Sequence, residues 1–508
     1  MDGGSPSSDG GWSVPDAGGG EVHGSRVLHY RTDLADFTQP IASELQAFAL
    51  EEGGLRPLTV VTAPEGTFRI PDAPAGQYYL RLGTFHLLTD SRFVNLDLYS
   101  LGRQDAERAT SRSAAVTVTA SNLPLQPLDT YPRWEAVSSN LGTSASVDTD
   151  EPVPAGQASV SGLPATYNSY YPEIPRLLDA SRGDYLYFTH LIERDNGTSS
   201  YMAVDRFFTQ GVSLRPDETT ALEGVFQEAR PRTLTLEWWR SRFEAYKLQV
   251  HPRVTTSEQD ITISPTAWSA DAWYGYSGDL MYSYSGAGLT DVVTSFTYGN
   301  PYPFSWGEVI ILSHFSRIDV RLPGTSSGWL RQGLKDTRRV ADVAKGGPFA
   351  PRISPAQDVT VDGIDAQREH TLGSLTPRLR WKAPLLGTPS AYRVRITHLS
   401  ANGNSTRTSH VAYLSTKETS IDVFPGILQP GQKYVFMVSA YLTPGVDLST
   451  HPYANQVLTD VASADAVSSI LSTPASVGPE RASLPLVTEP SSTESLEFKA
   501  PRHFARGP

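Results

Sequence analysis

The sequence predicts an all-β chain of several tandem β-sandwich domains, with disordered tails that are Gly/Ser-rich at the N-terminus and Ser/Pro-rich at the C-terminus. Three observations predict this class. Many short stretches place apolar residues at every second position, as Leu234, Leu236 and Trp238 do, which is the period of a half-buried strand. The chain holds 23 Tyr, 18 Phe and 9 Trp, residue types that sheets favour. Its 41 Gly and 38 Pro supply the turns that many short strands need.

The length indicates more than one hydrophobic core. A chain of 508 residues exceeds what a single core usually serves, and roughly three or four domains are expected. The first segment, residues 1–22, is dominated by Gly, Ser and Asp and has no apolar run. We interpret it as a flexible tether.

The first domain is expected over residues 23–110, and its clearest stretch is PEGTFRIPDAPAGQYYLRL, from Pro64 to Leu82. Apolar residues alternate with polar ones on both sides of a corner that contains Pro71, Pro74 and Gly76. Pro presets φ, and Gly accepts positive φ. The stretch therefore predicts two strands joined by a sheet corner.

This pattern carries a family resemblance. The order Gly66-x-Phe68-x-Ile70-Pro71, followed by Pro74-Ala75-Gly76-x-Tyr78-x-Leu80, resembles the prealbumin-like (carboxypeptidase regulatory-like) domain. The resemblance implies a β-sandwich accessory domain that brings no catalytic residues.

The middle of the chain, residues 111–347, is predicted to be an aromatic-rich β region that forms one large or two small sandwiches. Apolar residues dominate from Tyr185 to Ile192 and from Tyr201 to Phe208, and a loop with Asp195-Asn196-Gly197 lies between the two stretches. This arrangement is typical of a hairpin. The polar run that begins at Lys335 and the Gly346-Gly347-Pro348 sequence are interpreted as a linker.

Residues 348–462 carry the second resemblance. Trp381 lies in one alternating stretch, and Tyr392, Val394 and Ile396 form another. The later motif Leu428-x-Pro430-Gly431-x-x-Tyr434-x-Phe436-x-Val438-x-Ala440 completes the pattern. Together they resemble the fibronectin type III domain, and the resemblance implies that Tyr434 makes a corner hydrogen bond while its alternating partners enter the core.

From Ser463 the chain is rich in Ser, Pro, Ala and Glu, and we place a disordered tail at 463–508 because this composition buries too little apolar surface. The order of tether, prealbumin-like domain and fibronectin type III-like domain resembles modular bacterial surface lipoproteins. That resemblance implies an extracytoplasmic location, at the bacterial cell surface or in the periplasm. It also implies an outer-membrane lipid anchor on a cysteine that this sequence lacks.

Composition excludes several kinds of function. The sequence has no cysteine, which excludes disulfides, Cys-ligated zinc and thiol catalysis. The net charge of −12, with no block of Lys and Arg, argues against a nucleic-acid partner. No stretch is long and apolar enough for a membrane-spanning helix.

Motifs for chemistry are weak. Gly324-Thr325-Ser326-Ser327-Gly328 fits the pattern of a nucleophile elbow, but the elbow needs a strand before it and a helix after it, so we interpret it as a loop. His190 is interpreted as a packed sheet residue. The acidic stretches at 148–151 and 358–365 lack the full spacing of a calcium loop and are interpreted as solvated turns. No catalytic residue, cofactor or metal is assigned.

One aromatic cluster offers a candidate ligand site. Its members are Trp268, Trp273, Tyr274, Tyr276, Asp279, Tyr298, Asn300, Tyr302 and Trp306. Aromatic faces beside carboxylate and amide groups stack on sugars or anchor a protein partner. The alternative is that the rings fill the core. An exposed row of rings would favour binding.

These observations predict a non-enzymatic exported protein, a cell-surface or periplasmic scaffold that binds a protein or glycan through loops and aromatics. One alternative is a carbohydrate-binding module assembly that uses the 268–306 cluster. The other is a hydrolase in the middle region, which would need acidic or Ser/His groups that converge in one cleft.

Overall fold

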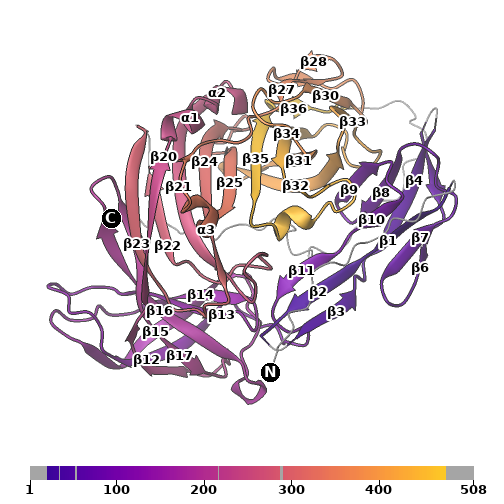
Figure 1. Cartoon of the computed structure of the whole chain (residues 1–508). Coiled ribbons are helices and arrows are strands. Elements are labelled where there is room, and N and C mark those ends of the chain that lie inside the picture. The colour runs from indigo at the N-terminus through magenta and orange to yellow at the C-terminus, as the bar shows by residue number, and fades with distance from the viewer. Residues whose placement is uncertain (1–19, 34, 52–53, 216, 286–289, 476–508) are drawn as a thin grey trace.

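The computed structural model describes residues 20–33, 35–51, 54–215, 217–285 and 290–475. Strands dominate, helices are short, and the strands form several sheets (Figure 1). The predicted all-β class is confirmed. The predicted tether at 1–22 and the tail beyond 475 fall almost wholly outside the described residues.

The N-terminal region is a sandwich whose strands form three sheets. Its elements are β1 Val22–Ser25, β2 Val27–Arg31, β3 Asp36–Pro40, β4 Leu45–Glu51, β5 Gly54–Leu58, β6 Val61–Thr62, β7 Thr67–Ile70, β8 Tyr78–Leu82, β9 Phe85–Thr89, β10 Phe93–Asn95 and β11 Leu98–Leu101. β7 pairs with β1, whereas β8 pairs with β4 and β9. The stretch from Pro64 to Leu82 therefore crosses from one sheet to another, as its corner pattern predicts. Membership of the prealbumin-like family stays a prediction.

The first part of the middle region is a curled sheet around its own core. Its elements are β12 Ser113–Ser121, β13 Arg133–Ser138, β14 Thr143–Thr149, β15 Ser159–Tyr171, η1 Ala180–Arg182, β16 Tyr185–Asp195, β17 Ser200–Gly211, β18 Thr220–Val225 and β19 Gln227–Glu228. β16 and β17 form the predicted antiparallel hairpin. The Gln210 side chain of β17 bridges to β18, because its Nε2 donates to the Ala221 carbonyl (3.3 Å) and its Oε1 accepts from the Glu223 amide (3.0 Å).

The second part of the middle region stacks two sheets. Its elements are β20 Arg230–Trp238, α1 Arg240–Glu244, α2 Lys247–Val250, β21 Val254–Thr266, β22 Met281–Ser285, β23 Val292–Asn300, β24 Gly307–Asp319, β25 Trp329–Arg339, α3 Val340–Val343 and β26 Pro348–Phe349. β23, β20 and β26 form one sheet, and β22, β21, β24 and β25 lie in the other. The alternating residues Leu234, Leu236 and Trp238 are buried between these sheets.

The C-terminal region is a sandwich of two sheets. Its elements are β27 Gln357–Val361, β28 Ile364–Asp365, β29 His370–Thr371, β30 Arg378–Lys382, β31 Ala391–Asn402, β32 Ser405–Thr416, β33 Ser420–Asp422, β34 Lys433–Leu442, η2 Ala454–Gln456, β35 Val461–Val467 and β36 Leu471–Ser472. β28, β27, β30 and β33 form one sheet, and β32, β31, β34, β35 and β36 continue the other.

The C-terminal pairing confirms a fibronectin type III-like sandwich. Trp381 of β30 and Tyr434 of β34 are both buried in the core. The Gln429 backbone N–H donates to Tyr434 Oη at 2.9 Å, which is the corner hydrogen bond that the sequence pattern implies.

Two sequence interpretations are wrong at the junction between these regions. The polar run from Lys335 to Arg339, interpreted as a linker, is the end of β25. Ser463, placed at the start of a disordered tail, lies in the middle of β35, and β36 follows at Leu471–Ser472. The reason is that β35 is built from small residues. Ala462, Ala464 and Ala466 are buried, and β35 is held by backbone pairing with its neighbouring strands and not by large apolar side chains of its own.

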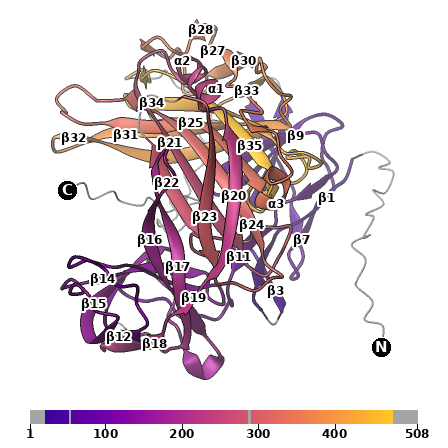
Figure 2. The ribbon, with the colours of Figure 1, turned by 60° about the vertical axis from the view of Figure 1, so that its left-hand side comes forward.

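The regions are joined edge to edge by backbone pairing. β35 pairs with β25 on one side and with β34 on the other, both antiparallel. β9 of the N-terminal region pairs with β32 in parallel, and β17 pairs with β22. One hydrogen-bonded sheet therefore passes through every region of the molecule; Figure 2 shows β16 and β17 of its first part below β22.

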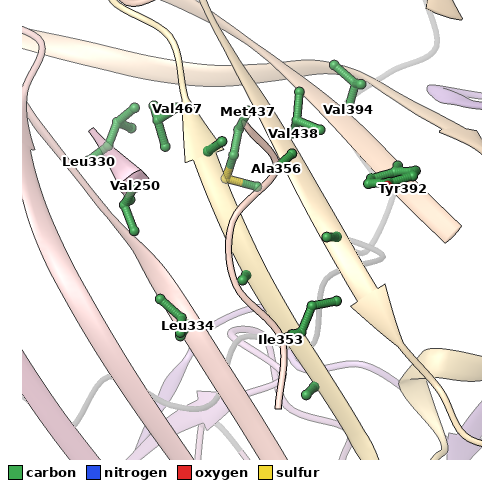
Figure 3. Close-up of a cluster of buried hydrophobic side chains, with 14 of the residues drawn as sticks. Val250, Leu330, Leu334, Ile353, Ala356, Tyr392, Val394, Met437, Val438 and Val467 are labelled. Carbon is green, nitrogen blue, oxygen red and sulfur yellow. The ribbon is translucent and has the colours of Figure 1, made fainter. Parts of the chain in front are cut away.

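The hydrophobic core is also continuous across the junction. Figure 3 shows side chains of the middle region and of the C-terminal sandwich gathered around β35; those labelled are Val250, Leu330, Leu334, Ile353, Ala356, Tyr392, Val394, Met437, Val438 and Val467. Burial of large aliphatic side chains contributes about 1.5–3 kcal/mol each. This shared core holds the middle region and the C-terminal sandwich together.

Candidate functional site

The nine predicted site residues come from two connections in the second part of the middle region. One is the loop 267–280 between β21 and β22, and the other runs from the end of β23 into β24. The first loop is ordered by Ser269, whose Oγ accepts from the amides of Asp271 (3.1 Å) and Ala272 (3.0 Å). The two connections therefore present their side chains in fixed positions.

The rings of this cluster pack on one another. Trp306 stacks on Tyr302, with centroids 4.8 Å apart and planes at 13°, and Trp268 meets Trp306 edge-on at 4.7 Å. Tyr187 of β16 contacts Tyr302 at 4.6 Å. These geometries are favourable for aromatic pairs, and they join the two parts of the middle region.

Most of the predicted site is buried, which agrees with the alternative that the rings fill the core, and these members form no exposed row. Seven of the nine residues are buried: Trp273, Tyr276, Asp279, Tyr298, Asn300, Tyr302 and Trp306. The physical reason is that the sheet has two apolar faces here. Tyr170 and Tyr171 of β15 cover the face that carries Trp273 and Tyr276.

The polar members are used internally. Asn300 Nδ2 donates to Glu308 Oε1 at 2.6 Å, and Tyr298 Oη donates to Glu308 Oε2 at 2.7 Å. Burial raises the pKa of Tyr298, and the neighbouring carboxylate of Glu308 raises it further. Asn300 Oδ1 also accepts from the Tyr302 amide at 2.8 Å. These contacts lock the β23–β24 turn.

Two buried carboxylates lie among tyrosines where the two parts of the middle region meet. Glu135 of β13 and Asp279 of the 267–280 loop are 7% and 3% exposed. Burial, and then the charges of these carboxylates, hold the pKa values of Tyr170, Tyr276 and Tyr302 well above the usual range. These phenols are therefore protonated at neutral pH.

The partners of this cluster belong to the protein itself. Tyr302 Oη donates to the Ser277 carbonyl at 2.9 Å, and Ser264 Oγ donates to Asp279 Oδ1 at 3.0 Å. Paired carboxylates and phenols can perform acid–base chemistry. In this arrangement Tyr302 and Asp279 find hydrogen-bond partners within the protein, as buried polar groups generally do.

Trp268 and Tyr274 are only partly buried, and they meet residues that sequence reasoning missed. His29 of β2 stacks on Tyr99 of β11 with centroids 4.7 Å apart, and Tyr99 lies 5.8 Å from Tyr274. The Arg31 guanidinium lies 5.4 Å from the Tyr274 ring centroid, and its Nη2 donates to the Trp268 carbonyl at 3.3 Å. We name these five residues the aromatic junction.

The aromatic junction contains a strained residue. Trp268 has φ of 62°, a left-handed conformation that is uncommon for a bulky side chain. Such strain often accompanies functional sites. A sequence signal for the new members does exist, because His29 and Arg31 alternate along β2. That spacing does not reveal which loop the strand faces.

The other sequence motifs have structural roles. Ser326 N donates to the Asn404 carbonyl at 2.9 Å, and Ser327 Oγ donates to Ser405 Oγ at 2.9 Å. The Gly324–Gly328 loop thus contacts the tip of the β31–β32 hairpin. His190 is 6% exposed, and burial lowers its pKa to about 4. Both observations agree with the sequence interpretation of a loop and a packed sheet residue.

The structure also bears on metals and membranes. Within the described ranges, no three His, Asp or Glu side chains are grouped in a way that could hold a metal ion. No helix in the described part of the chain is long and apolar enough to span a membrane.

Comparisons with known proteins identify no family. No protein-family model matches the chain, and no curated protein matches it. Among solved structures, the chain is similar to the crystal structure of the FN1-FN3 domains of chicken CNTN1, with 12% identity over 63% of this chain and 93% of that chain. The TM-score is 0.13. The description of the C-terminal region rests on its own strand pairing.

Proposed function

We propose that this chain is a non-enzymatic, exported binding or scaffold protein. It acts outside the cytoplasm, at a bacterial cell surface or in the periplasm, and a lipid anchor holds it there. The absence of cysteine and the Gly/Ser-rich first segment support export. The fibronectin type III-like sandwich supports a modular scaffold, because such rigid frames present loops for binding.

One observation carries this proposal. β35 is hydrogen-bonded on both edges, to β25 and to β34. Regions joined only by linkers move relative to one another by default. Regions joined by a shared strand and a shared core keep one orientation, so loops far apart in the sequence stay in fixed positions for a partner.

Spin-label distances test the scaffold. Because the chain has no cysteine, pairs of introduced cysteines accept labels at chosen sites only. Labels at the exposed residues Glu223 and Thr408 report the distance between the middle region and the C-terminal sandwich. A single narrow distribution is expected. A broad or multiple distribution would overturn the rigid scaffold.

The hydrolase alternative depends on Glu135 and Asp279. The Glu135→Gln/Asp279→Asn variant keeps side-chain shape and removes both charges. We expect the wild-type chain to turn over no ester, glycoside or peptide substrate. If turnover is found and the double variant loses it while remaining folded by circular dichroism, the non-enzymatic proposal fails.

Glycan binding is the second candidate function, now at the aromatic junction. Partly buried rings can stack on a sugar while a neighbouring guanidinium donates hydrogen bonds to it. Tyr274→Ala is expected to reduce retention on a glycan array, whereas Tyr284→Ala, a more exposed ring elsewhere, is expected to leave it unchanged. Equal retention of both variants contradicts this candidate.

A further inference from the structure

The connections β12–β13 (residues 122–132) and β14–β15 (residues 150–158) form a rigid double loop at one end of the curled sheet. Leu123 N donates to the Ala158 carbonyl at 2.9 Å, and Thr130 and Val153 exchange both backbone hydrogen bonds, at 3.0 and 2.8 Å. The Asp129 carboxylate accepts from the Ala155 amide at 2.9 Å. We name this double loop the lip. Its conformation is fixed before any partner arrives.

The lip presents large apolar side chains to solvent. Leu125, Leu128 and Tyr131 are 67%, 74% and 60% exposed. Isolated exposed apolar residues are ordinary, but several on one ordered loop mark an interaction surface. Because the backbone is already held, a partner that covers these side chains pays little ordering entropy at the lip.

The surroundings of these side chains are acidic. Asp129, Asp148, Asp150 and Glu151 are exposed, and Arg133 is the only basic residue between positions 122 and 158. In the part of the chain that the structure describes, no Lys, Arg or His forms an ion pair with these four carboxylates. Asp148 instead accepts from neutral donors, for example Asn168 Nδ2 at 2.7 Å.

We propose that the lip docks a cationic, amphipathic segment of another protein. The apolar side chains of the segment cover Leu125, Leu128 and Tyr131, while its Lys or Arg residues pair with the acidic rim. Charge complementarity selects this occupant. A second copy of this chain would bring like charge, and so would an anionic membrane surface. The inference rests on the proposed binding function and adds the chemistry of the partner.

The first experiment measures peptide binding to the full chain by fluorescence anisotropy. The probe is a labelled peptide of alternating Lys and Leu, and the two control peptides alternate Lys with Ser and Glu with Leu. We expect the Lys/Leu peptide to bind at least about tenfold more tightly than either control, a difference of about 1.4 kcal/mol. Its affinity is expected to fall as salt rises. Equal binding of the Glu/Leu peptide overturns the proposal, and so does absence of binding.

Variants locate the binding on the lip. The change Leu125→Ser/Leu128→Ser/Asp150→Lys/Glu151→Lys is expected to weaken Lys/Leu binding by at least about tenfold. The matched control, Leu385→Ser/Glu418→Lys, alters an exposed leucine and an exposed carboxylate of the C-terminal sandwich and is expected to bind as the wild type does. Equal loss in both, or retention in the lip variant, overturns the proposal.

Two further measurements distinguish the other occupants. Hydrogen exchange of the wild-type chain is expected to slow at residues 122–132 and 150–158 when the Lys/Leu peptide is added, a readout that needs no variant. Sedimentation that shows a dimer lost in the lip variant overturns the proposal in favour of a second copy. Binding to phosphatidylglycerol vesicles through the lip overturns it in favour of a membrane. If the lip binds no peptide, the spin-label distances are unaffected, so the rigid scaffold is tested separately from the lip.

Discussion

The Arg352 guanidinium donates hydrogen bonds to both carboxylate oxygens of Asp336: Nη2 lies 2.8 Å from Oδ1, and Nε lies 3.1 Å from Oδ2. Asp336 lies on β25 and is 1% exposed. Arg338 donates to the same two oxygens, and Arg352 also forms an ion pair with Asp460, just before β35. The buried carboxylate of Asp336 thus links β25 to the segment after β26 and, through Arg352, to the residue just before β35.

Removal of the carboxylate should be costly. Asp336→Ala removes the buried carboxylate that Arg338 and Arg352 share and leaves Arg352 with Asp460 alone; breaking a buried pair on one side costs about 3–5 kcal/mol. Urea unfolding followed by tryptophan fluorescence measures the loss. The control is Arg56→Ala, which breaks an exposed pair with Glu51 and should change stability by less than about 1 kcal/mol. Similar losses of unfolding free energy in the two variants would show that the Asp336 ion pairs contribute no more than an exposed pair does.

β35 should be the strand whose disruption loosens two neighbours at once. Ala464 pairs with Leu334 of β25 and with Ala440 of β34. Proline at this position removes an N–H and cannot sit in a central strand, so Ala464→Pro is expected to lower hydrogen-exchange protection in β25 and β34 together. Ser463→Thr, a strand-compatible change on the same strand, should leave protection as it is. Loss confined to one neighbour would refute a shared strand.

The unfolding free energy should depend on pH between about 6.5 and 4. Burial lowers the pKa of His86 to about 3 and the pKa values of His251 and His314 to about 4, whereas the unfolded value is about 6.5. The folded protein keeps these rings neutral. Their contribution is therefore complete above pH about 6.5 and is lost as the pH falls towards the folded values, by about 1 kcal/mol per pH unit for each group.

Substitution of His86 separates this effect from other titrations. His86→Gln cannot take up a proton, so urea midpoints measured from pH 7 to pH 4 should fall less steeply than those of the wild type. Thr408→Gln, at an exposed position that carries no titrating group, should keep the wild-type slope. A slope unchanged by His86→Gln would show that His86 is not among the responsible groups.

The corner tyrosine makes a measurable contribution. Tyr434→Phe keeps the ring in the core but removes the acceptor of the Gln429 amide. An unsatisfied donor costs about 1–3 kcal/mol, so the urea midpoint should fall. Tyr131→Phe alters an exposed hydroxyl and should shift stability by less than about 0.5 kcal/mol. A Tyr434→Phe variant as stable as the wild type would show that this corner hydrogen bond does not contribute to stability.

Gly102 allows the end of the N-terminal region to lie close to the backbone of Leu141 in the middle region. Gly102 has φ of +95°, and a Cβ built there lies 2.4 Å from the Leu141 carbonyl carbon. Gly102→Ala should cost about 1 kcal/mol for the left-handed backbone and about 1–3 kcal/mol more for the clash. Gly83→Ala, with φ of +57° and open space, isolates the first of these costs. If the two variants lower the thermal unfolding temperature equally, the clash with Leu141 costs no free energy, because the structure adjusts to remove it.

Local pattern predicted the strands that alternate or that adjoin a turn signal. The corner from Pro64 to Leu82, the β16–β17 hairpin and the motif around Tyr434 are the examples, although only β7 has one solvated face and β8, β16 and β34 are largely buried on both faces. The strand in each case alternates or carries its own turn signal, so no knowledge of distant neighbours is needed.

The pattern failed where a distant partner decides the structure. β35 reads as Ala, Ser and Asp, and its stability comes from two flanking strands more than a hundred residues apart in the sequence. In the sequence, Asp336 resembles a surface residue, because its partner Arg352 comes close to it only in the folded chain. The aromatic cluster was found by composition, but the burial of Tyr276 and the exposure of Tyr274 depend on how β15 and β11 pack against one loop.

β35 is synthesised after both of the strands that it joins. A ribosome or translocation channel releases residues in order, so the β25 edge that receives β35 has no partner from residue 339 to residue 461, and the β34 edge has none from residue 442 to residue 461. The joint between the middle region and the C-terminal sandwich therefore closes only when β35 emerges, and synthesis that stops before that point leaves the joint open.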